Sequence, residues 1–260
     1  MRVLFVADIF GRPGRKALAW GVAKERLRGE IDLLVVNGEN AAGGFGITPD
    51  IAREFLDLGA DVITTGNHVW DKREVYALLD EEPRLLRPDN YPPGNPGRGL
   101  WAGEAAGVPC AVVNLQGRVF MKEIDCPFRR LDELLDGPAA RGARVVVVDF
   151  HAEATAEKVG MGRYADGRVA AVIGTHTHVP SADARVLPGG TAYVTDAGMT
   201  GPHGGVIGVD HAAAIERFLR QTPNRFTVAS EDVRFQGVRL EIDEESGRAT
   251  AIERIDEPVG

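Results

Sequence analysis

The chain has 260 residues, enough for one large domain, or at most two, with a buried core, and its 44% hydrophobic and 26% charged residues are ordinary for a soluble globular protein. The formal net charge of −8 disfavours a protein whose main task is to grip nucleic acid through its phosphates. We therefore expect residues 1–260 to form a single domain that makes no stable complex with nucleic acid.

The cysteines and the N-terminus indicate the compartment. Cys110 and Cys126 are the only two cysteines, which favours reduced thiols in a cytoplasmic protein. The first residues, MRVLFVADIFGRPGR, lack the long apolar region of a signal peptide and predict a strand. No stretch approaches the ~20 apolar residues that a membrane span needs. The expectation is a cytoplasmic protein with no membrane partner.

Apolar runs alternate with amphipathic segments, which predicts an α/β fold built in layers. In chain order we expect a strand at 3–6, a helix at 15–28, a strand at 33–36, a helix from Thr48-Pro49 to about Gly59, a strand at 62–65 and a helix at 72–81. Next we expect a loop at 84–99, a hairpin over 100–116 that turns near Gly107, and a helix at 127–135. These are followed by a strand at 145–148, a helix at 153–164 and strands at 169–173 and 192–195. A helix within 207–219 and alternating strands over 228–255 complete the chain.

Five of the expected strands end at residues that can bind metal. These residues are Asp8; Glu39 and Asn40; Asn67 and His68; His151; and His176 and His178. A single polar residue after a strand is usually a turn former, but four of the six histidines fall at these strand ends. In layered α/β folds, functional groups gather at the carboxyl ends of strands. His176 and His178 are two residues apart and are expected to share one face of their strand.

The ligand types favour two metal ions. A closed structural zinc site is disfavoured because no cysteine is involved, whereas carboxylate, carboxamide and imidazole suit Fe, Mn, Co or Zn in an open hydrolytic site. The seven candidate ligands are Asp8, Glu39, Asn40, Asn67, His151, His176 and His178. They are too many for one tetrahedral ion and predict two ions ~3.5–4 Å apart, with Glu39 as the bridge. Two divalent ions, two carboxylates and one hydroxide leave a charge of about +1, which suits a phosphodiester.

Three further residues are candidates for other roles. His68 directly follows Asn67 and is expected just outside the metal ligands, as a general acid worth ~10²–10⁴ in rate, or else as a residue that only orients a neighbour. The segment FGRPGR lacks the Lys-Ser/Thr of a P-loop, so we expect a turn that places Asp8, with Arg12 or Arg15 able to touch substrate. His203, in TGPHGG, is a candidate for lining the pocket, with a plain loop histidine as the alternative.

The strings NGEN, GNH, a lone His151 and GTHTH resemble the motifs of calcineurin-like metallophosphoesterases. Two departures are visible: Phe10 stands where the family has a histidine, and Gly38-Glu39-Asn40 stands where Gly-Asp is usual. Together with DIFGRPGR, VVNGENAAGGFGIT, DFHAEATAEK and TDAGMTGPHGGVIG, these departures resemble the bacterial YmdB-like family over nearly the whole chain.

This resemblance implies a four-layer αββα sandwich, a binuclear metal centre and hydrolysis of 2′,3′-cyclic nucleotides or related small phosphodiesters. By position, one ion would take Asp8, Glu39, Asn40 and His178, the other Glu39, Asn67, His151 and His176, and His68 would be the catalytic acid. The ions are expected to be divalent or mixed-valence, with iron foremost and manganese, zinc or cobalt as alternatives. The competing functions are a broad phosphomonoesterase or a nuclease on the same centre, and a metal-dependent regulatory protein with low activity. Assembly into a homo-oligomer is left open.

Overall fold

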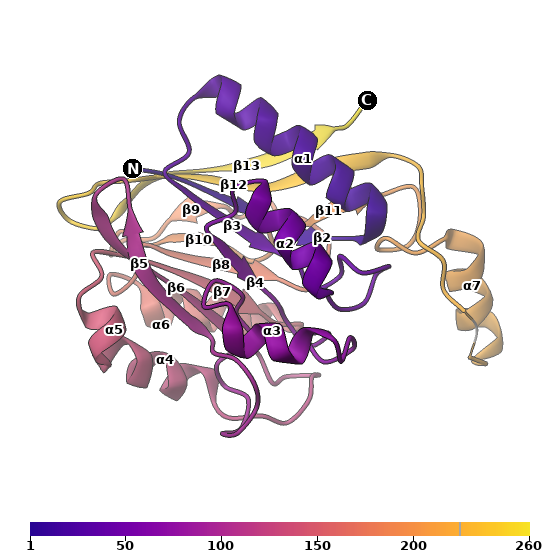
Figure 1. Cartoon of the computed structure of the whole chain (residues 1–260), viewed down its shortest axis with the longest axis horizontal. Coiled ribbons are helices and arrows are strands. Elements are labelled where there is room, and N and C mark those ends of the chain that lie inside the picture. The colour runs from indigo at the N-terminus through magenta and orange to yellow at the C-terminus, as the bar shows by residue number, and fades with distance from the viewer. Residues whose placement is uncertain (224) are drawn as a thin grey trace.

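The computed structural model describes residues 1–223 and 225–260. Two mixed sheets form its centre (Figure 1). The first runs in the order β2-β11-β12-β1-β3-β4, with β13 paired to β12, and the second in the order β5-β6-β7-β8-β10-β9. The first sheet comprises β1 (Arg2–Val6), β2 (Asp8–Ile9), β3 (Leu33–Asn37), β4 (Val62–Thr64), β11 (Met199–Pro202), β12 (Val233–Ile242) and β13 (Ala249–Pro258). The second comprises β5 (Leu100–Ala105), β6 (Val108–Gln116), β7 (Val145–His151), β8 (Ala171–Thr175), β9 (Arg185–Val186) and β10 (Ala192–Val194).

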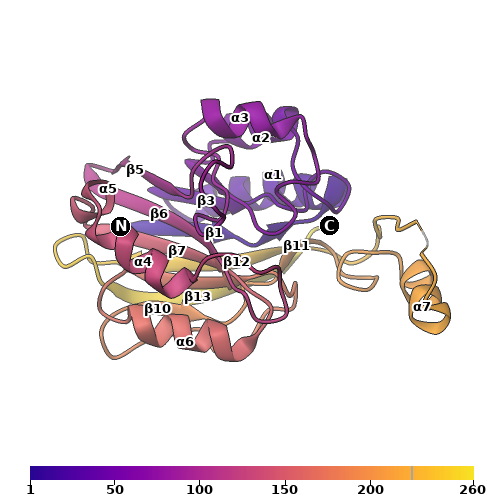
Figure 2. The same ribbon diagram turned by 90° about the horizontal axis from the view of Figure 1, so that it is seen from below.

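Helices cover the outer face of each sheet, which confirms the αββα expectation (Figure 2). The helices are α1 (Gly11–Arg28), α2 (Pro49–Asp57), α3 (Val75–Glu81), α4 (Pro127–Asp136), α5 (Pro138–Arg141), α6 (Thr155–Ala165) and α7 (His211–Arg220). α1, α2 and α3 pack on the first sheet, and α4 and α6 pack on the second. Among the residues described, none of the helices combines the length and the hydropathy that a membrane crossing needs.

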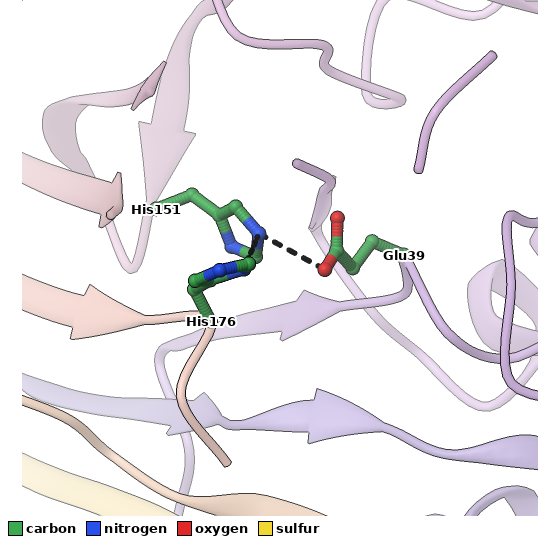
Figure 3. Close-up of side chains that lie close together, drawn as sticks. All are labelled: Glu39, His151 and His176. Atoms are coloured by element: carbon green, nitrogen blue, oxygen red, sulfur yellow. Dashed lines mark hydrogen bonds and ion pairs between the residues drawn. The ribbon is translucent and has the colours of Figure 1, made fainter. Parts of the chain in front are cut away.

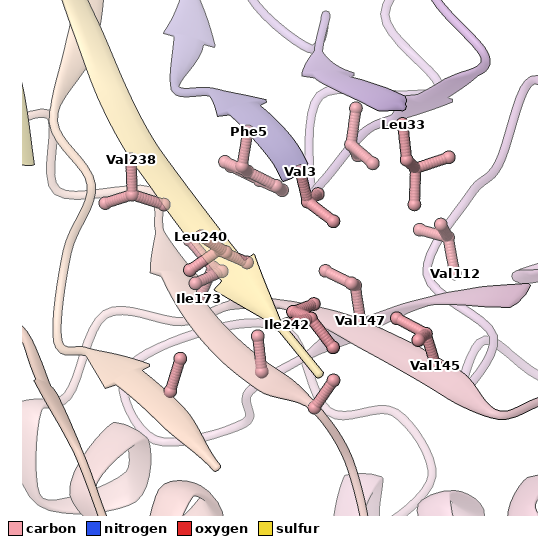
Figure 4. Packing of buried hydrophobic residues seen from close by; sticks show 14 of the residues in the cluster. Val3, Phe5, Leu33, Val112, Val145, Val147, Ile173, Val238, Leu240 and Ile242 are labelled. Carbon is pink, nitrogen blue, oxygen red and sulfur yellow. The ribbon is translucent and has the colours of Figure 1, made fainter. Parts of the chain in front are cut away.

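The inner faces of the two sheets pack directly on each other (Figure 4). Val3 and Phe5 of β1 and Val238 of β12 meet Val147 of β7 and Ile173 of β8 in this inner core. Strands that are buried on both faces read as continuous apolar runs, because each face needs its own apolar side chains. This is why the apolar runs of β1, β3, β7 and β8 could be recognised as strands from the sequence.

The start of α1 differs from expectation. FGRPGR is not a free turn: the helix begins at Gly11, four residues before the expected start. Pro13 is tolerated because amides of a first helical turn have no acceptor inside the helix. The amide of Gly11 donates to the carbonyl of Asn40 at 2.9 Å, and a Cβ on Gly14 would lie 2.4 Å from the carbonyl oxygen of Thr200. Close packing on β11 and on the loop after β3 therefore fixes this helix start.

Several short elements escaped prediction. β2, β9, β11 and α5 have two to four residues each and lack a recognisable period. β8 covers 171–175 rather than 169–173, and β7 continues to His151 instead of ending at Val148. The two long C-terminal strands are confirmed as an antiparallel pair, β12 with β13. These shifts place His151 within a strand and the Gly174-Thr175 pair at the end of β8.

Candidate metal centre

The seven candidate ligands come from both sheets and meet between them. Asp8 lies on β2, Glu39 and Asn40 follow β3, and Asn67 follows β4 in the first sheet. From the second sheet, His151 ends β7 while His176 and His178 follow β8. Figure 3 shows Glu39 facing His151 and His176 across the gap between these segments. Direct contacts connect the seven side chains in two sets, one of Glu39, Asn67, His151 and His176 and one of Asp8, Asn40 and His178. The two sets meet where the ligand atoms of Asp8, Glu39 and His178 lie within 4.8 Å of one another, so the structure brings together every residue of the expected set.

The cluster divides into two groups that share Glu39. In one group the ligand atoms of Glu39, His151 and His176 lie within 4.8 Å of one another, and in the other those of Asp8, Glu39 and His178 do. The shortest separations are 2.9 Å from Glu39 Oε1 to His151 Nε2 and 3.1 Å from His151 Nε2 to His176 Nδ1. A carboxylate common to both groups is the geometry that a pair of bridged ions requires.

Hydrogen bonds on the outer side of His151 fix its tautomer. Thr175 Oγ1 donates to Asp149 Oδ1 at 2.7 Å, so its lone pair is free to accept from His151 Nδ1 at 2.9 Å. The proton is then on Nδ1, and the Nε2 lone pair points toward the cluster. A histidine oriented in this way is prepared to bind a cation.

Hydrogen bonds on the outer side also orient three other candidate ligands, His178, His176 and Asn40. The Nδ1–H of His178 donates to the carbonyl of Ile207 at 3.1 Å, and the Nε2–H of His176 donates to Glu153 Oε2 at 3.1 Å. The Asn40 amide nitrogen donates to the carbonyl of Gly44 at 2.9 Å, which turns its Oδ1 inward, 3.2 Å from His178 Nε2. Each outer proton is thus held by an acceptor of the protein, and each lone pair points inward.

Acceptor atoms gather on the inner side of the cluster. The buried Asp8 Oδ1 accepts no hydrogen bond from the described residues, and Glu39 Oε1 has His151 Nε2 as its neighbour, at 2.9 Å. His151 Nε2 lies 3.1 Å from Asn67 Oδ1, another acceptor. Lone pairs so close repel one another unless positive charge lies between them. The residues therefore fit a pair of cations, and carboxylate, carboxamide and imidazole are donors that suit Fe, Mn, Co and Zn.

The pKa shifts of Asp8, Glu39 and His151 also indicate that the cluster favours positive charge. Burial and the charge of Glu39 raise the pKa of Asp8 well above its usual range, although His151 opposes the shift. Burial alone would raise the pKa of Glu39, but the charge and hydrogen bonding of His151 lower it to about 2. Burial works against the proton on His151, yet Glu39 and Asp8 raise the pKa of this histidine to about 9. A proton and a metal ion thus compete for the same inner nitrogen.

The other two histidines of the cluster, His176 and His178, stay neutral. Burial, together with the charge of His151, lowers the pKa of His176 to about 3. Burial also lowers the pKa of His178, against the hydrogen bond to the carbonyl of Ile207. Neutral imidazoles beside a charged carboxylate form the protonation pattern that metal ligation needs.

The expectation that His176 and His178 share a strand face is wrong. β8 ends at Thr175, and both histidines have left-handed backbone, with φ of 101° and 65°. Such a conformation costs of order 1–3 kcal/mol for a residue other than glycine and persists only where the surroundings impose it. The two side chains reach the cluster because the chain bends sharply at each of them.

A buried ion pair imposes this bend. Asp196 Oδ2 accepts from the amide of Thr177 at 3.1 Å, from its hydroxyl at 2.7 Å, and from Lys158 Nζ at 2.7 Å. The side chains of Lys158 and Asp196 are only 1% and 3% exposed. Thr177 is thereby tied down between the two histidines, and the pair Lys158–Asp196 acts as a positioning device for both.

We expect Lys158→Met to lower the free energy of unfolding by about 3–5 kcal/mol, because it leaves the charge of Asp196 buried without a partner. Urea denaturation at neutral pH measures the change. The double variant Lys158→Met/Asp196→Asn should regain part of the loss, and Lys16→Met, an exposed site, should stay within about 0.5 kcal/mol of the parent. Equal stability of Lys158→Met and the parent would show that the pair is dispensable.

His68 lies beside the cluster and outside both ligand groups. Its backbone amide donates to Glu39 Oε2 at 3.2 Å, and its Nδ1 lies 2.8 Å from Asp71 Oδ2. The ring packs edge-on against Phe45, with centroids 5.1 Å apart. Because Nδ1 is engaged by Asp71, Nε2 is the nitrogen left to act in the neighbouring cavity. His68 thus lies beside the candidate ligands and in the wall of a cavity, and Asp71 is a partner that was not foreseen.

The cavity holds about 490 Å³ and opens beside the cluster. Glu39, Asn40, His68, His176 and His178 lie in its wall. Neither Arg12 nor His203 is among its lining residues: Arg12 is exposed on the first turn of α1, and His203 Nε2 donates to the carbonyl of Met199 at 2.9 Å. The structure therefore does not bring these two substrate-binding candidates into the site.

Sequence reasoning missed the residues that orient the candidate ligands and His68. These are Asp149, Lys158, Thr175 and Asp196 for the ligands and Asp71 for His68. A signal was present for some of them. Asp71 follows His68 by three residues, and the strings DFHAEATAEK and TDAGMTG contain Asp149, Lys158 and Asp196. None of these residues stands out by type alone, because a carboxylate in a turn usually serves the local backbone.

Comparisons with known proteins show which family and which structures the chain is similar to. A family model described as "YmdB-like protein" matches residues 4–255. A protein of Bacillus subtilis (strain 168) named 2′,3′-cyclic-nucleotide 2′-phosphodiesterase is 48% identical over 98% of this chain and 96% of its own. Two solved structures have a TM-score of 0.93: a hypothetical protein from Thermus thermophilus (44% identity, 99% of both chains) and a novel phosphatase of Mycoplasma pneumoniae (32% identity, 99% of this chain and 93% of the other).

Proposed function

The chain belongs to the YmdB-like protein family, and from this premise we propose that it is a binuclear metal-dependent phosphodiesterase that prefers 2′,3′-cyclic nucleotides. The observation that carries the proposal is the shared Glu39: one buried carboxylate belongs to two ligand groups at the wall of a cavity. The activity of the Bacillus subtilis relative supports the choice of substrate.

In this proposal Asp8, Glu39, Asn40 and His178 hold one ion, and Glu39, Asn67, His151 and His176 hold the other. Iron is the first choice for both, with manganese, zinc or cobalt as alternatives. When bound, such ions supply positive charge to the phosphoryl oxygens and make hydroxide available at neutral pH. Asp149, through Thr175, and Asp196, through Thr177, keep the three histidines in the orientation that ligation needs.

His68 supplies the proton for the leaving group. Opening the five-membered cyclic ester expels a ribose oxygen, and an alkoxide is a poor leaving group until it is protonated. Asp71 accepts from His68 Nδ1, so its carboxylate both orients the ring and balances the charge of the imidazolium. The protonated Nε2 then donates to the departing oxygen. A binding or regulatory protein has no need of such an acid, which favours an enzyme over that alternative.

The size of the cavity favours a small substrate. A volume of about 490 Å³ falls within the roughly 300–1,000 Å³ usual for small-molecule sites. A nuclease needs a long groove with positive charge along it, whereas this chain has a net charge of −8. A phosphomonoesterase on the same centre is the second candidate, because the family relatives include a protein described as a phosphatase.

A substrate panel tests the proposal on protein whose metal content has been measured. The substrates are 2′,3′-cyclic AMP, 3′,5′-cyclic AMP, p-nitrophenyl phosphate and a short RNA. We expect the highest kcat/KM for 2′,3′-cyclic AMP, loss of that activity after chelation and its return when metal is restored. A higher kcat/KM for p-nitrophenyl phosphate or for RNA would replace the proposal with the phosphomonoesterase or the nuclease.

A further inference from the structure

The cavity beside the metal centre has a second wall that the reaction at phosphorus does not explain. This wall comes from the segment that contains α7, and its apolar residues are Val206, Ile207, Val209, Ala214, Phe218 and Phe226. Ile207 is 53% exposed and Phe218 is 67% exposed. Apolar side chains left open at a cavity that also holds the polar cluster indicate a ligand with an apolar part.

The same wall carries the positively charged side chain of Arg217. The guanidinium carbon of Arg217 lies 5.0 Å from the ring centroid of Phe226, and both side chains line the cavity. Among the residues that the structure describes, no carboxylate pairs with Arg217, whereas Arg220 pairs with Glu216 at 3.3 Å. Flat aromatic and guanidinium faces are the surfaces on which proteins stack nucleobases.

The wall is tied to the metal centre by a direct contact. The carbonyl of Ile207 accepts the hydrogen bond that orients His178. Asp210 caps the N-terminus of α7, where its carboxylate accepts from the amides of Ala212 and Ala213, and the helix stands away from both sheets (Figures 1 and 2). No extended packing of α7 against another helix or strand is found in the described part of the chain. A ligand with its phosphate at the histidines would therefore find an open apolar surface for the rest of its body.

We propose that this wall binds the nucleobase of the substrate, with Phe218 and Phe226 as stacking surfaces and Arg217 beside them. The inference rests on the proposed function and deepens it: the chain would distinguish a cyclic nucleotide from a cyclic phosphodiester that has no base. Stacking suits the task because every base has a flat face, so the wall selects for a base without selecting one base over another.

The test compares 2′,3′-cyclic AMP with glycerol 1,2-cyclic phosphate, which has the same five-membered cyclic ester and no base. In metal-loaded protein, Phe226→Ala and Phe218→Ala should each reduce the preference for the nucleotide by roughly tenfold to a hundredfold. Most of the change should be in KM for 2′,3′-cyclic AMP. Phe120→Ala is the matched control, because Phe120 is 89% exposed and is not a lining residue of the cavity. It should keep the parent preference.

An unchanged preference in Phe218→Ala and Phe226→Ala overturns the inference, and so does an equal loss on both substrates. An altered oligomeric state with equal losses would assign the apolar face to contacts between copies of the chain. If the parent hydrolyses neither cyclic ester, the proposed function fails instead. Calorimetric binding of 2′,3′-cyclic AMP to metal-loaded His68→Ala then still decides the inference: Phe226→Ala, added to it, must weaken the binding.

Discussion

Glu39→Gln is expected to abolish the hydrolysis of 2′,3′-cyclic AMP and to deprive the protein of its metal. Glu39 is the one carboxylate common to both ligand groups of the described residues, with its pKa held at about 2 and its charge buried. Glutamine keeps the shape of the side chain but removes the charge and replaces one oxygen by a donor. A donor that points into a cluster of lone pairs cannot bridge two cations.

Metal analysis after gel filtration, together with turnover of 2′,3′-cyclic AMP, measures this effect. Glu74→Gln is the matched control, because Glu74 is exposed, belongs to neither ligand group and is not a lining residue of the cavity. It should keep the metal content and the turnover of the parent. Full metal content and normal turnover in Glu39→Gln would contradict the binuclear assignment.

His68→Ala is expected to keep its metal and to lose ~10²–10⁴ in kcat on 2′,3′-cyclic AMP, the usual contribution of a positioned acid. Metal is retained because His68 lies outside both ligand groups. Asp71→Asn should lose less, since asparagine can still accept from His68 Nδ1 but does not balance the charge of an imidazolium. Because the variant keeps its metal, the loss in kcat measures the proton transfer and not the assembly of the metal centre.

A change of leaving group separates an acid from a residue that only orients its neighbours. p-Nitrophenolate departs without a proton, so His68→Ala should lose far less on a p-nitrophenyl diester of a nucleotide than on 2′,3′-cyclic AMP. The parent and the variant are compared on both substrates at equal metal content. Equal losses on the two substrates would assign His68 to an orienting role.

The clustering of the candidate ligands could be predicted from the sequence because the fold uses the same kind of buried strand several times. Each of these apolar runs forms a buried strand, and the polar residues that follow the strands of the two sheets gather at one place between the sheets. This reasoning placed Asp8, Glu39, Asn67 and His151 near one another without any distance information. It depends only on residue type and local period, which a sequence displays directly.

The bend at His176 and His178 could not be predicted in this way. Its left-handed backbone depends on Asp196 and Lys158, which come from distant parts of the chain and meet Thr177 only after folding. The same holds for the start of α1, which contacts with Asn40 and β11 determine. Arg12 was singled out because it is basic and close to Asp8 in sequence, but the helix directs it to solvent.

The candidate ligands come from both sheets, and this has a consequence for the stability of the protein. Ions held by Asp8 and Glu39 on one side and by His151 and His178 on the other would act as cross-links between the halves of the sandwich. Binding to the folded form alone adds about 2.7 kcal/mol of stability when the free ion is at a hundred times its Kd. The lifetime of the protein would then depend on the metal supply of the cell. A shortage of metal would lower the free energy of unfolding and, at the same time, remove the activity.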